Sequence, residues 1–355
     1  MKKHLLAIVV CASALALLGQ QPKVSNTNFT VESIGGTLTA TVDRFRHASE
    51  QRWLGYEVAA LPQSHFSTCS NWSDASSMDN ECCGEYRLED NSNNGLNHND
   101  TAAEHNVYVY VLLRLDQGQI IKVRPVMAGC HLNAGGVPFT WLTGVKAEDS
   151  VAFLSGLATQ SFESNRQHVV DEALLSISYH GTPEATNALS EIASSAARMH
   201  LREQAAFWLG VQRGHEGFLA LQSLEKNSTE TAFREKLPFD FSQNSDPGAE
   251  DELLHMAKSD PDTKVREQAL FWLAQKAGKK ATAALTDAIQ NDPETDVKKK
   301  AVFALSQLPK DESVPQLIHV ADTNSNPAVR KEAFFWLGQS HDPRALAYLE
   351  QVLKR

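Results

Sequence analysis

Residues 265–273 read VREQALFWL, and the chain repeats this stretch at a fixed spacing of 32 residues. The other copies are LREQAAFWL at 201–209, VKKKAVFAL at 297–305, VRKEAFFWL at 329–337, and the more degenerate FREKLPFDF at 233–241 and VVDEALLSI at 169–177. Such regular self-similarity is the signature of a repeat architecture, in which each unit is one supersecondary element. The architecture of the C-terminal half therefore follows from these nine residues and their copies.

Each unit predicts two helices. In the first helix, apolar residues recur every four positions, as at Val265, Ala269 and Leu273, and so share one face. The second helix is marked by a row of leucines at one repeat position, namely Leu189, Leu221, Leu253, Leu285, Leu317 and Leu349. An aspartate followed by proline, as at Asp246 and Asp342, suits the start of that second helix. One helix pair cannot bury its apolar face alone, so the six pairs are expected to stack into a superhelix.

The repeated V-R-x-x-A-x-x-x-L pattern resembles the HEAT-repeat family of α-solenoids. Its short units are similar to the bacterial HEAT-like repeats of phycobilisome lyases. The resemblance covers residues 167–355 and implies an armadillo-type superhelix. Residues 53–56 and 130–136, with Trp141 and Leu142, are similar to exported bacterial HEAT-repeat proteins of unknown function. That second resemblance implies a head followed by a solenoid.

The N-terminus has the pattern of a secretory signal peptide. Lys2 and Lys3 precede an apolar run from Leu5 to Leu18, which ends at the polar residues Gln20 and Gln21. This order predicts that residues 1–19 are a signal peptide. The apolar run is shorter than the ~20 residues of a membrane-spanning helix, so we expect no stable membrane insertion after cleavage. The predicted location is periplasmic or secreted.

Four cysteines remain after cleavage of the signal peptide: Cys69, Cys82, Cys83 and Cys130. In an oxidising compartment an even number of cysteines predicts two disulfides. The connectivity stays open, although a bond between the neighbours Cys82 and Cys83 would be strained. A zinc site that adds His65 or His131 is the alternative, but the ligand spacings of zinc modules are missing.

The predicted organisation is α+β and multidomain. Residues 23–146 form a β-rich domain with disulfides, residues 147–166 a connecting helix, and residues 167–355 the six repeats. The expected strands are a hairpin of 28–34 with 37–45 around Gly35-Gly36, a strand from Trp53 to Val58, and a hairpin of 107–115 with 120–126. Residues 64–106 are polar and hold most of the cysteines, so a long loop is expected there.

Composition and motifs exclude several function classes. The formal charge of −10 argues against binding to nucleic acid. The sequence has no P-loop, G-x-G-x-x-G, H-E-x-x-H or G-x-S-x-G motif. Some HEAT-like proteins are di-iron hydroxylases with several His-Glu pairs, whereas His215-Glu216 is the only such pair here. We therefore assign no catalytic residue, metal or cofactor.

Five cations occupy one repeat position and are called the cation row: Arg202, Arg234, Arg266, Lys298 and Arg330. They could line a groove for an acidic ligand. The favoured interpretation is that they bridge neighbouring repeats, with Asp262, Glu294 and Asn326 of the preceding loops as partners.

An aromatic row also has two interpretations. It consists of Phe207, Phe239, Phe271, Phe303 and Phe335, with Trp208, Trp272 and Trp336 beside it. Neighbouring residues on a helix point ~100° apart, so the two sets cannot be buried equally. Core packing is favoured, because burial of an aromatic side chain is stabilising. The alternative is a partly exposed stripe for a partner helix or peptide.

The third repeat departs from the pattern. Pro238 lies inside its first helix, where proline removes a hydrogen bond, and Asp240 takes a tryptophan position. With the polar stretch 243–250, this suggests either a tolerated irregularity or a hinge. Taken together, the sequence predicts a non-enzymatic scaffold or adaptor of the cell envelope that binds a protein or peptide. The alternatives are an enzyme or cofactor-handling protein with a Cys/His site in the head, and phycobilin-lyase-like activity by family analogy.

Overall fold

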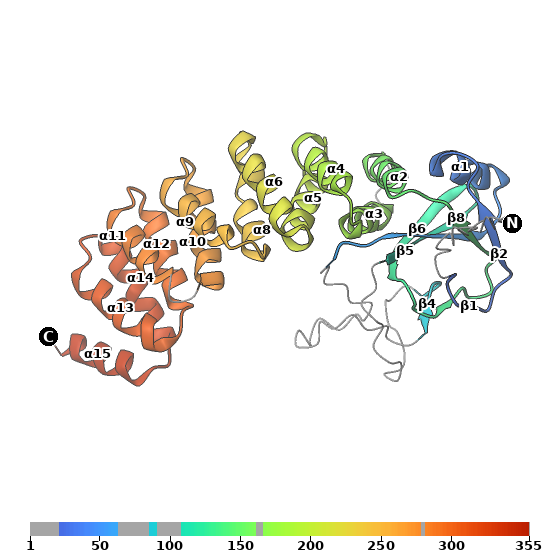
Figure 1. The fold of residues 1–355 in the computed structure, drawn as a ribbon. Coiled ribbons are helices and arrows are strands. Elements are labelled where there is room, and N and C mark those ends of the chain that lie inside the picture. The colour runs from blue at the N-terminus through green and yellow to red at the C-terminus, as the bar shows by residue number, and fades with distance from the viewer. Residues whose placement is uncertain (1–20, 63–84, 91–107, 161–165, 278–280, 355) are drawn as a thin grey trace, which may run out of the picture.

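The computed structural model describes residues 21–62, 85–90, 108–160, 166–277 and 281–354. A β-containing region lies at one end, and a helical array extends from it to the C-terminus (Figure 1). No helix in these ranges reaches the length and hydropathy that a membrane crossing requires. The predicted signal peptide lies outside the described residues, so export stays a prediction.

The main sheet is mixed. Its strand order is β2, β8, β3, β5, β6; β8 pairs in parallel with β2 and β3, and the other pairs are antiparallel. The bounds are β2 Phe29–Ser33, β3 Arg52–Ala59, β5 Tyr108–Asp116, β6 Gln119–Met127 and β8 Phe139–Thr143. A small parallel sheet joins β1 Val24–Ser25, β7 Leu132–Asn133 and β4 Tyr86–Arg87.

Both faces of the main sheet are covered. Successive side chains of a strand point to opposite faces, and β3 illustrates this. Trp53 donates its indole N–H to Glu89 beside β4 (2.7 Å), whereas the hydroxyl of Tyr56 contacts Ser150 in helix α2, Ala147–Thr159 (2.8 Å). The predicted strand Trp53–Val58 is thus confirmed within β3.

The first predicted hairpin is wrong. Residues 38–48 form helix α1, and β2 pairs with β8 instead. The Oγ1 of Thr37 accepts the N–H of Ala40 and so begins the helix, whose buried residues are Leu38, Thr41 and Val42. The buried residues follow the helical period, whereas the apolar residues Leu38, Ala40 and Val42 also alternate as in a strand, which explains the error. The second hairpin is confirmed, because β5 and β6 pair antiparallel across the turn at Gln117 and Gly118.

The head and the array share buried contacts. Helix α3, Gln167–Tyr179, packs against β6, while α2 packs against α3 and α4. The fully buried Ser150 accepts or donates hydrogen bonds with both Tyr56 of β3 and His180, which follows α3 (2.8 Å each). Burial lowers the pKa of His180 to about 4, so its imidazole is neutral and serves as a structural link. The helix predicted to connect the two parts therefore contributes to one continuous core.

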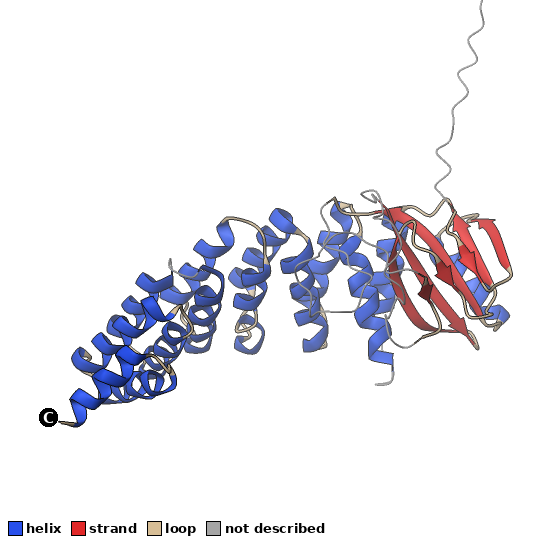
Figure 2. Cartoon of the chain, turned by 90° about the horizontal axis from the view of Figure 1, so that it is seen from below, coloured by secondary structure: helices blue, strands red, loops and turns tan. Residues whose placement is uncertain are grey.

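The array has two layers (Figure 2). The first helices of the repeats contact one another in sequence, and so do the second helices. The first layer comprises α3, α5 Met199–Gln212, α7 Thr231–Arg234 with α8 Leu237–Gln243, α10 Thr263–Ala277, α12 Thr295–Ser306 and α14 Pro327–Gln339. The second layer comprises α4 Pro183–Ser195, α6 Gly214–Asn227, α9 Gly248–Ser259, α11 Ala281–Asn291, α13 Lys310–Thr323 and α15 Pro343–Leu353.

The first helix of the third repeat is broken into α7 and α8, with Pro238 in the first turn of α8. The loop after α8 is fixed on both sides. The buried amide of Asn244 donates to the carbonyls of Gly210 (3.1 Å) and Gly214 (3.0 Å), and Lys276 donates to the carbonyl of Asn244 (2.7 Å). These bonds join the broken repeat to both neighbours. The hinge at Pro238 and Asp240 stays a prediction.

Candidate protein-binding surface

The aromatic rows of the first helices form one continuous stack of rings, here called the aromatic ladder. Its members are Phe207, Trp208, Phe239, Phe271, Trp272, Phe303, Phe335 and Trp336. Within a helix, each tryptophan meets the preceding phenylalanine edge to face, as Phe271 and Trp272 do (4.9 Å between centroids, 75°). Between helices, the contacts alternate in kind. The ladder therefore runs from α5 to α14 without a gap.

The alternation follows the residue at the tryptophan position. Where that residue is Asp240, Phe207 and Phe239 stack in parallel at 5.8 Å and 11°; where it is Ala304, Phe271 and Phe303 do the same at 5.8 Å and 2°. A tryptophan at that position meets the previous phenylalanine ring in a tilted contact, as Phe239 and Trp272 (4.6 Å) and Phe303 and Trp336 (4.9 Å) show. The true repeat of this surface is thus a pair of units. The sequence carries this signal, because the residues at the tryptophan position run Trp, Asp, Trp, Ala, Trp from one repeat to the next.

The ladder is half-buried rather than core. The buried side of α5 consists of residues such as Leu201, Ala205 and Leu209, while Phe207 and Trp208 keep part of their surface in solvent. Phe335 at the end of the ladder is 53% exposed. The core interpretation favoured from the sequence therefore describes only one side of these rings. Aromatic–aromatic contacts join the repeats, and the open side remains accessible.

Charged groups line the ladder. The ammonium group of Lys300 lies 5.1 Å from the ring centroid of Phe271 and 4.9 Å from that of Phe303, within the range of a cation–π interaction. The indole N–H of Trp336 donates to Glu332 (2.8 Å). The surface thus offers apolar faces together with charged edges.

Three polar atoms along the ladder are buried without a hydrogen-bond partner. They are Nε1 of Trp208, Oδ2 of Asp240 and Oε1 of Glu267. Asp240 is only 3% exposed. Its burial, reinforced by the charge of Glu203 on α5, raises the pKa of Asp240 well above its usual range.

The cation row joins neighbouring repeats. Arg266 donates to both carboxylate oxygens of Asp292 in the loop after its own repeat (2.9 and 3.2 Å) and to the carbonyl of Asp260 in the loop before it (2.9 Å). Arg234 pairs with the side chain of Asp260 in the loop after its own repeat. Arg202 reaches Glu230 (2.7 Å), whereas Lys298 and Arg330 bond to backbone carbonyls.

The partners expected from the sequence were wrong. Asp262, Glu294 and Asn326 each lie two positions after the residue that accepts the hydrogen bond, as Asp260 and Asp292 do from Arg266. The oxygens of Asp262 and Asn326 instead accept backbone N–H groups at the start of α10 and α14. An arginine side chain is long enough to span more than one helical turn. The spacing in the sequence therefore does not distinguish the true acceptors from the residues two positions later.

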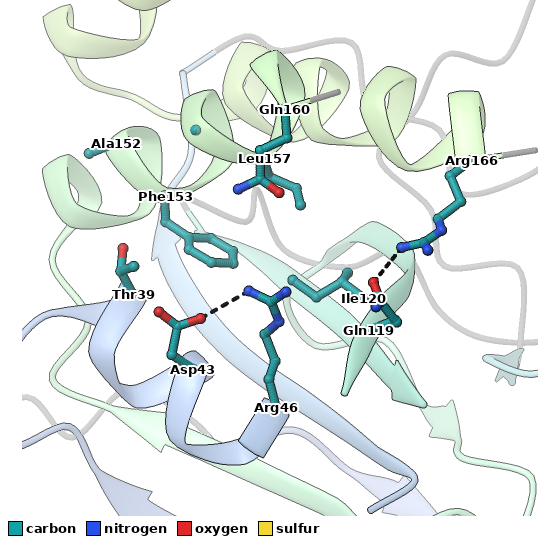
Figure 3. Close-up of a pocket in the computed structure, with 11 residues that line it drawn as sticks. Thr39, Asp43, Arg46, Gln119, Ile120, Ala152, Phe153, Leu157, Gln160 and Arg166 are labelled. Carbon is teal, nitrogen blue, oxygen red and sulfur yellow. Dashed lines mark hydrogen bonds and ion pairs between the residues drawn. The ribbon is translucent and has the colours of Figure 1, made fainter. Parts of the chain in front are cut away.

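A pocket in the head of about 340 Å³ lies between α1, α2 and β6 (Figure 3). Phe153, Leu157 and Ile120 supply its apolar lining. Its arginines are engaged, Arg46 with Asp43 (3.0 Å) and Arg166 with Gln119 (2.6 Å). A larger, open groove of about 800 Å³ runs between α4 and α6 and is lined mainly by hydroxyl, amide and carboxylate side chains.

The proposed Cys/His site falls largely outside the described residues, since these exclude Cys69, Cys82, Cys83 and His65. Cys130 is buried and His131 is exposed. In the part of the chain that is described, no three His, Cys, Asp or Glu side chains gather as metal ligands do. The disulfides stay a prediction. His215, from the single His-Glu pair, contacts Asp246 (2.6 Å).

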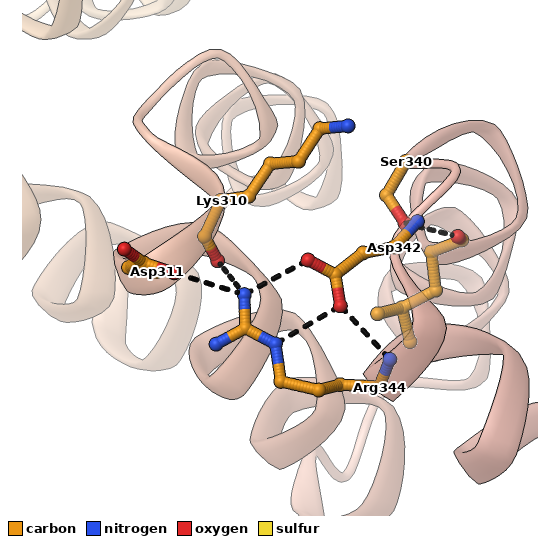
Figure 4. Close-up of polar contacts among 6 residues, drawn as sticks. Lys310, Asp311, Ser340, Asp342 and Arg344 are labelled. Atoms are coloured by element: carbon orange, nitrogen blue, oxygen red, sulfur yellow. Dashed lines mark hydrogen bonds and ion pairs between the residues drawn. The ribbon is translucent and has the colours of Figure 1, made fainter.

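The last two repeats are joined by a polar cluster (Figure 4). Arg344 contacts Asp342 (2.9 Å), the carbonyl of Lys310 (3.0 Å) and Asp311 (3.3 Å). Asp342 also accepts the backbone N–H of Arg344 and so caps α15, as its sequence context predicts. These bonds lower the pKa of Asp342 to about 2. The cluster pairs the guanidinium group of Arg344 with two carboxylates and a backbone carbonyl, and we assign it a structural role.

The fold defines an α-solenoid of stacked helix pairs. The HEAT repeats family model matches residues 250–322 and 282–355, so this part of the chain carries HEAT repeats. Similar solved structures include human deoxyhypusine hydroxylase in complex with glycerol, YibA of E. coli, and the complex of CpcE and CpcF of phycocyanin lyase from Nostoc sp. PCC7120.

These likenesses are distant. In the same order, the identities are 19%, 21% and 14%, and the TM-scores are 0.31, 0.37 and 0.27. The matches cover 58%, 59% and 56% of this chain and 90%, 79% and 80% of the others. No curated protein sequence matches the chain.

Proposed function

We propose that the protein is a non-enzymatic scaffold that binds a segment of another protein along the aromatic ladder. The observation that carries this proposal is the continuity of half-exposed rings across the first helices from α5 to α14, with Phe335 exposed to 53% at its end. Aromatic side chains are enriched among the residues that dominate protein interfaces. Solenoids also present extended surfaces on which a partner can lie across several repeats.

The edges of the ladder supply specificity in this proposal. Lys300 and Glu332 are held against ring atoms, so their charges have fixed positions on the surface. A partner must match both the apolar faces and these charges. Rim charges of this kind select among partners more than they add affinity.

The compartment is part of the same proposal. The basic, apolar and polar order of residues 1–21 supports export to the periplasm or beyond. Export would allow Cys69, Cys82, Cys83 and Cys130 to form two disulfides. Thiol titration of the exported, unfolded protein without reductant should then find none of these four cysteines free, and four reactive thiols would refute the disulfides.

Peptide selection with paired variants tests the binding surface. Peptides are selected from a displayed library on the immobilised full chain, and their affinities are then measured for the Phe335→Ala and Leu219→Ala variants. Leu219 is a matched control, because it is 46% exposed but lies on α6 in the second layer. We expect Phe335→Ala to weaken binding roughly tenfold, as for an interface hot spot, and Leu219→Ala to leave it unchanged. Equal effects of the two substitutions would refute the proposal.

A further inference from the structure

The two parallel ring stacks of the ladder differ in one respect. Over the Phe271–Phe303 stack lies the ammonium group of Lys300, within 5.1 Å of both centroids. The Phe207–Phe239 stack has the same geometry, at 5.8 Å and 11°, and Lys236 occupies the equivalent position 64 residues before Lys300. Within the described part of the chain, the ammonium group of Lys236 does not lie over either ring. Its ammonium group lies 3.9 Å from Glu235 instead.

The broken helix explains this difference. In the fourth and fifth repeats the first helix is continuous, so Lys300 lies one turn before Phe303 on the same helix. In the third repeat the chain breaks between α7 and α8, and Lys236 is the residue that flanks the start of α8. The helical register that places a lysine over the rings is therefore lost there.

Two acidic side chains adjoin this uncovered stack. Asp240 follows Phe239 directly, and its Oδ2 is buried without a partner. Glu203 lies one turn before Phe207 on α5, and its charge acts on Asp240. Other charged groups on helices packed against α8 are engaged elsewhere: Arg234 on α7 pairs with Asp260, and Lys276 on α10 donates to the carbonyls of Ser242 and Asn244 and feels the charge of Glu250 on α9. The stack thus combines ring faces with two acidic side chains, Glu203 and Asp240, which favour a bound cation.

We propose that Phe207, Phe239, Glu203 and Asp240 form a subsite for a basic side chain, lysine or arginine, of the bound segment. Lys300 shows the same contact made within the chain, on the equivalent stack. Burial is the main cause of the raised pKa of Asp240, and the charge of Glu203 adds to it. A cation bound beside Glu203 offsets that second contribution and attracts the ionised carboxylate of Asp240. Asp240 then releases its proton as the cation binds. Affinity for the cation therefore rises with pH over the range in which Asp240 titrates.

The subsite rests on the proposed function in one respect, namely that the cation belongs to a bound protein segment. Binding of a cation to the subsite can therefore be tested without a partner protein. The probes are Nα-acetyl-lysinamide and Nα-acetyl-argininamide, with the neutral Nα-acetyl-norleucinamide and potassium chloride at equal ionic strength as controls. The full chain carries ¹³C in its aspartate carboxyl groups, and the Asp240→Asn variant identifies the Asp240 signal. The measured quantity is the midpoint pH of that signal, with and without each probe.

We expect saturating lysine or arginine probe to lower the midpoint by about one pH unit, equivalent to a tenfold stronger affinity for the ionised form. Norleucine and salt should leave it unchanged. The Glu203→Gln variant should abolish the probe-induced shift, whereas Asp251→Asn, an exposed position on α9, should retain it. An unchanged midpoint with both cationic probes, or an equal shift with norleucine, would overturn the subsite. If the selected peptides bound the Phe335→Ala variant as tightly as the unsubstituted protein, the proposed function would be refuted instead.

Discussion

The ring of Phe239 contacts the indole of Trp272 with centroids 4.6 Å apart, across the boundary between the third and fourth repeats. Phe239 belongs to the broken helix and Trp272 to an intact one. Because Phe239 also stacks on Phe207, the ladder passes through the irregular repeat without interruption. The break alters the local register of Lys236 and Asp240 but leaves the rings in line.

Removal of the Trp272 ring should cost the protein more stability than removal of the Phe335 ring. Trp272 is half-buried between two phenylalanine rings, so Trp272→Ala should destabilise the protein by roughly 2–3 kcal/mol, below the cost for a fully buried tryptophan. Phe335→Ala should cost under about 1 kcal/mol, since that ring is mostly exposed. Denaturant unfolding checks both values, and a neutral Trp272→Ala would contradict the role of this ring in joining repeats.

The salt bridge between Arg266 and Asp292 should contribute more than those on the surface. Their side chains are only 9% and 7% exposed, and the contact is bidentate. Asp292→Asn should destabilise the protein by roughly 3 kcal/mol, because it leaves a buried guanidinium group without its counter-charge. The control is Asp296→Asn, whose side chain is 75% exposed in its pair with Lys299. That substitution should cost less than about 0.5 kcal/mol. Similar unfolding midpoints for the two variants would show that the cation row does not bridge repeats.

Close packing of α5 against α8 requires glycine at position 210. A Cβ atom there would lie 2.5 Å from the carbonyl oxygen of Asp240. Gly210→Ala should therefore destabilise the protein by about 1–3 kcal/mol. Gly156 is the matched control, since a Cβ at this position in α2 meets nothing within 4 Å. Gly156→Ala should stabilise the protein by about 0.5–1 kcal/mol. Thermal unfolding of both variants tests the pair, and a stabilising Gly210→Ala would be inconsistent with the contact.

The junction between head and array should make stability depend on pH. Burial raises the pKa of Glu172 in α3 to about 7, an effect that Asp171 reinforces and Arg124 opposes. The folded state thus binds this proton more tightly than the unfolded state, so stability falls as pH rises from 4.5 towards 7 and then levels. Glu172→Gln should flatten that slope, while Glu191→Gln, at an exposed position in α4, should preserve it. Urea unfolding at a series of pH values provides the comparison; an unchanged slope in Glu172→Gln would exclude this group as the cause.

The helical array was predictable from sequence because its information is local and repeated. One stretch of nine residues, with its copies, specifies the first helix, and a single leucine row marks the second. Residues 37–45 had no such redundancy. Their apolar residues fit a strand and a helix alike, and the decision depends on a tertiary contact, the parallel pairing of β2 with the distant β8.

The surface was only partly predictable. The sequence correctly indicated which aromatic residues share a repeat position, but their exposure depends on how far neighbouring helices approach. The partners of Arg266 were misplaced because side-chain reach is not encoded in spacing. The link from Tyr56 through Ser150 to His180 joins three separate elements, so no local pattern could have revealed it.

Site-specific photocrosslinking in cells that produce the protein natively tests the central claim most directly. Benzoyl-phenylalanine is placed at position 335 of the aromatic ladder or, as control, at position 219 of α6, both exposed in the structure. The account predicts a defined covalent adduct with another protein from position 335 and its absence from position 219. The same adduct should be lost when Trp272→Ala is added in a protein shown to remain folded. Adducts from position 219 with none from position 335 would contradict the assignment of the ladder as the binding surface.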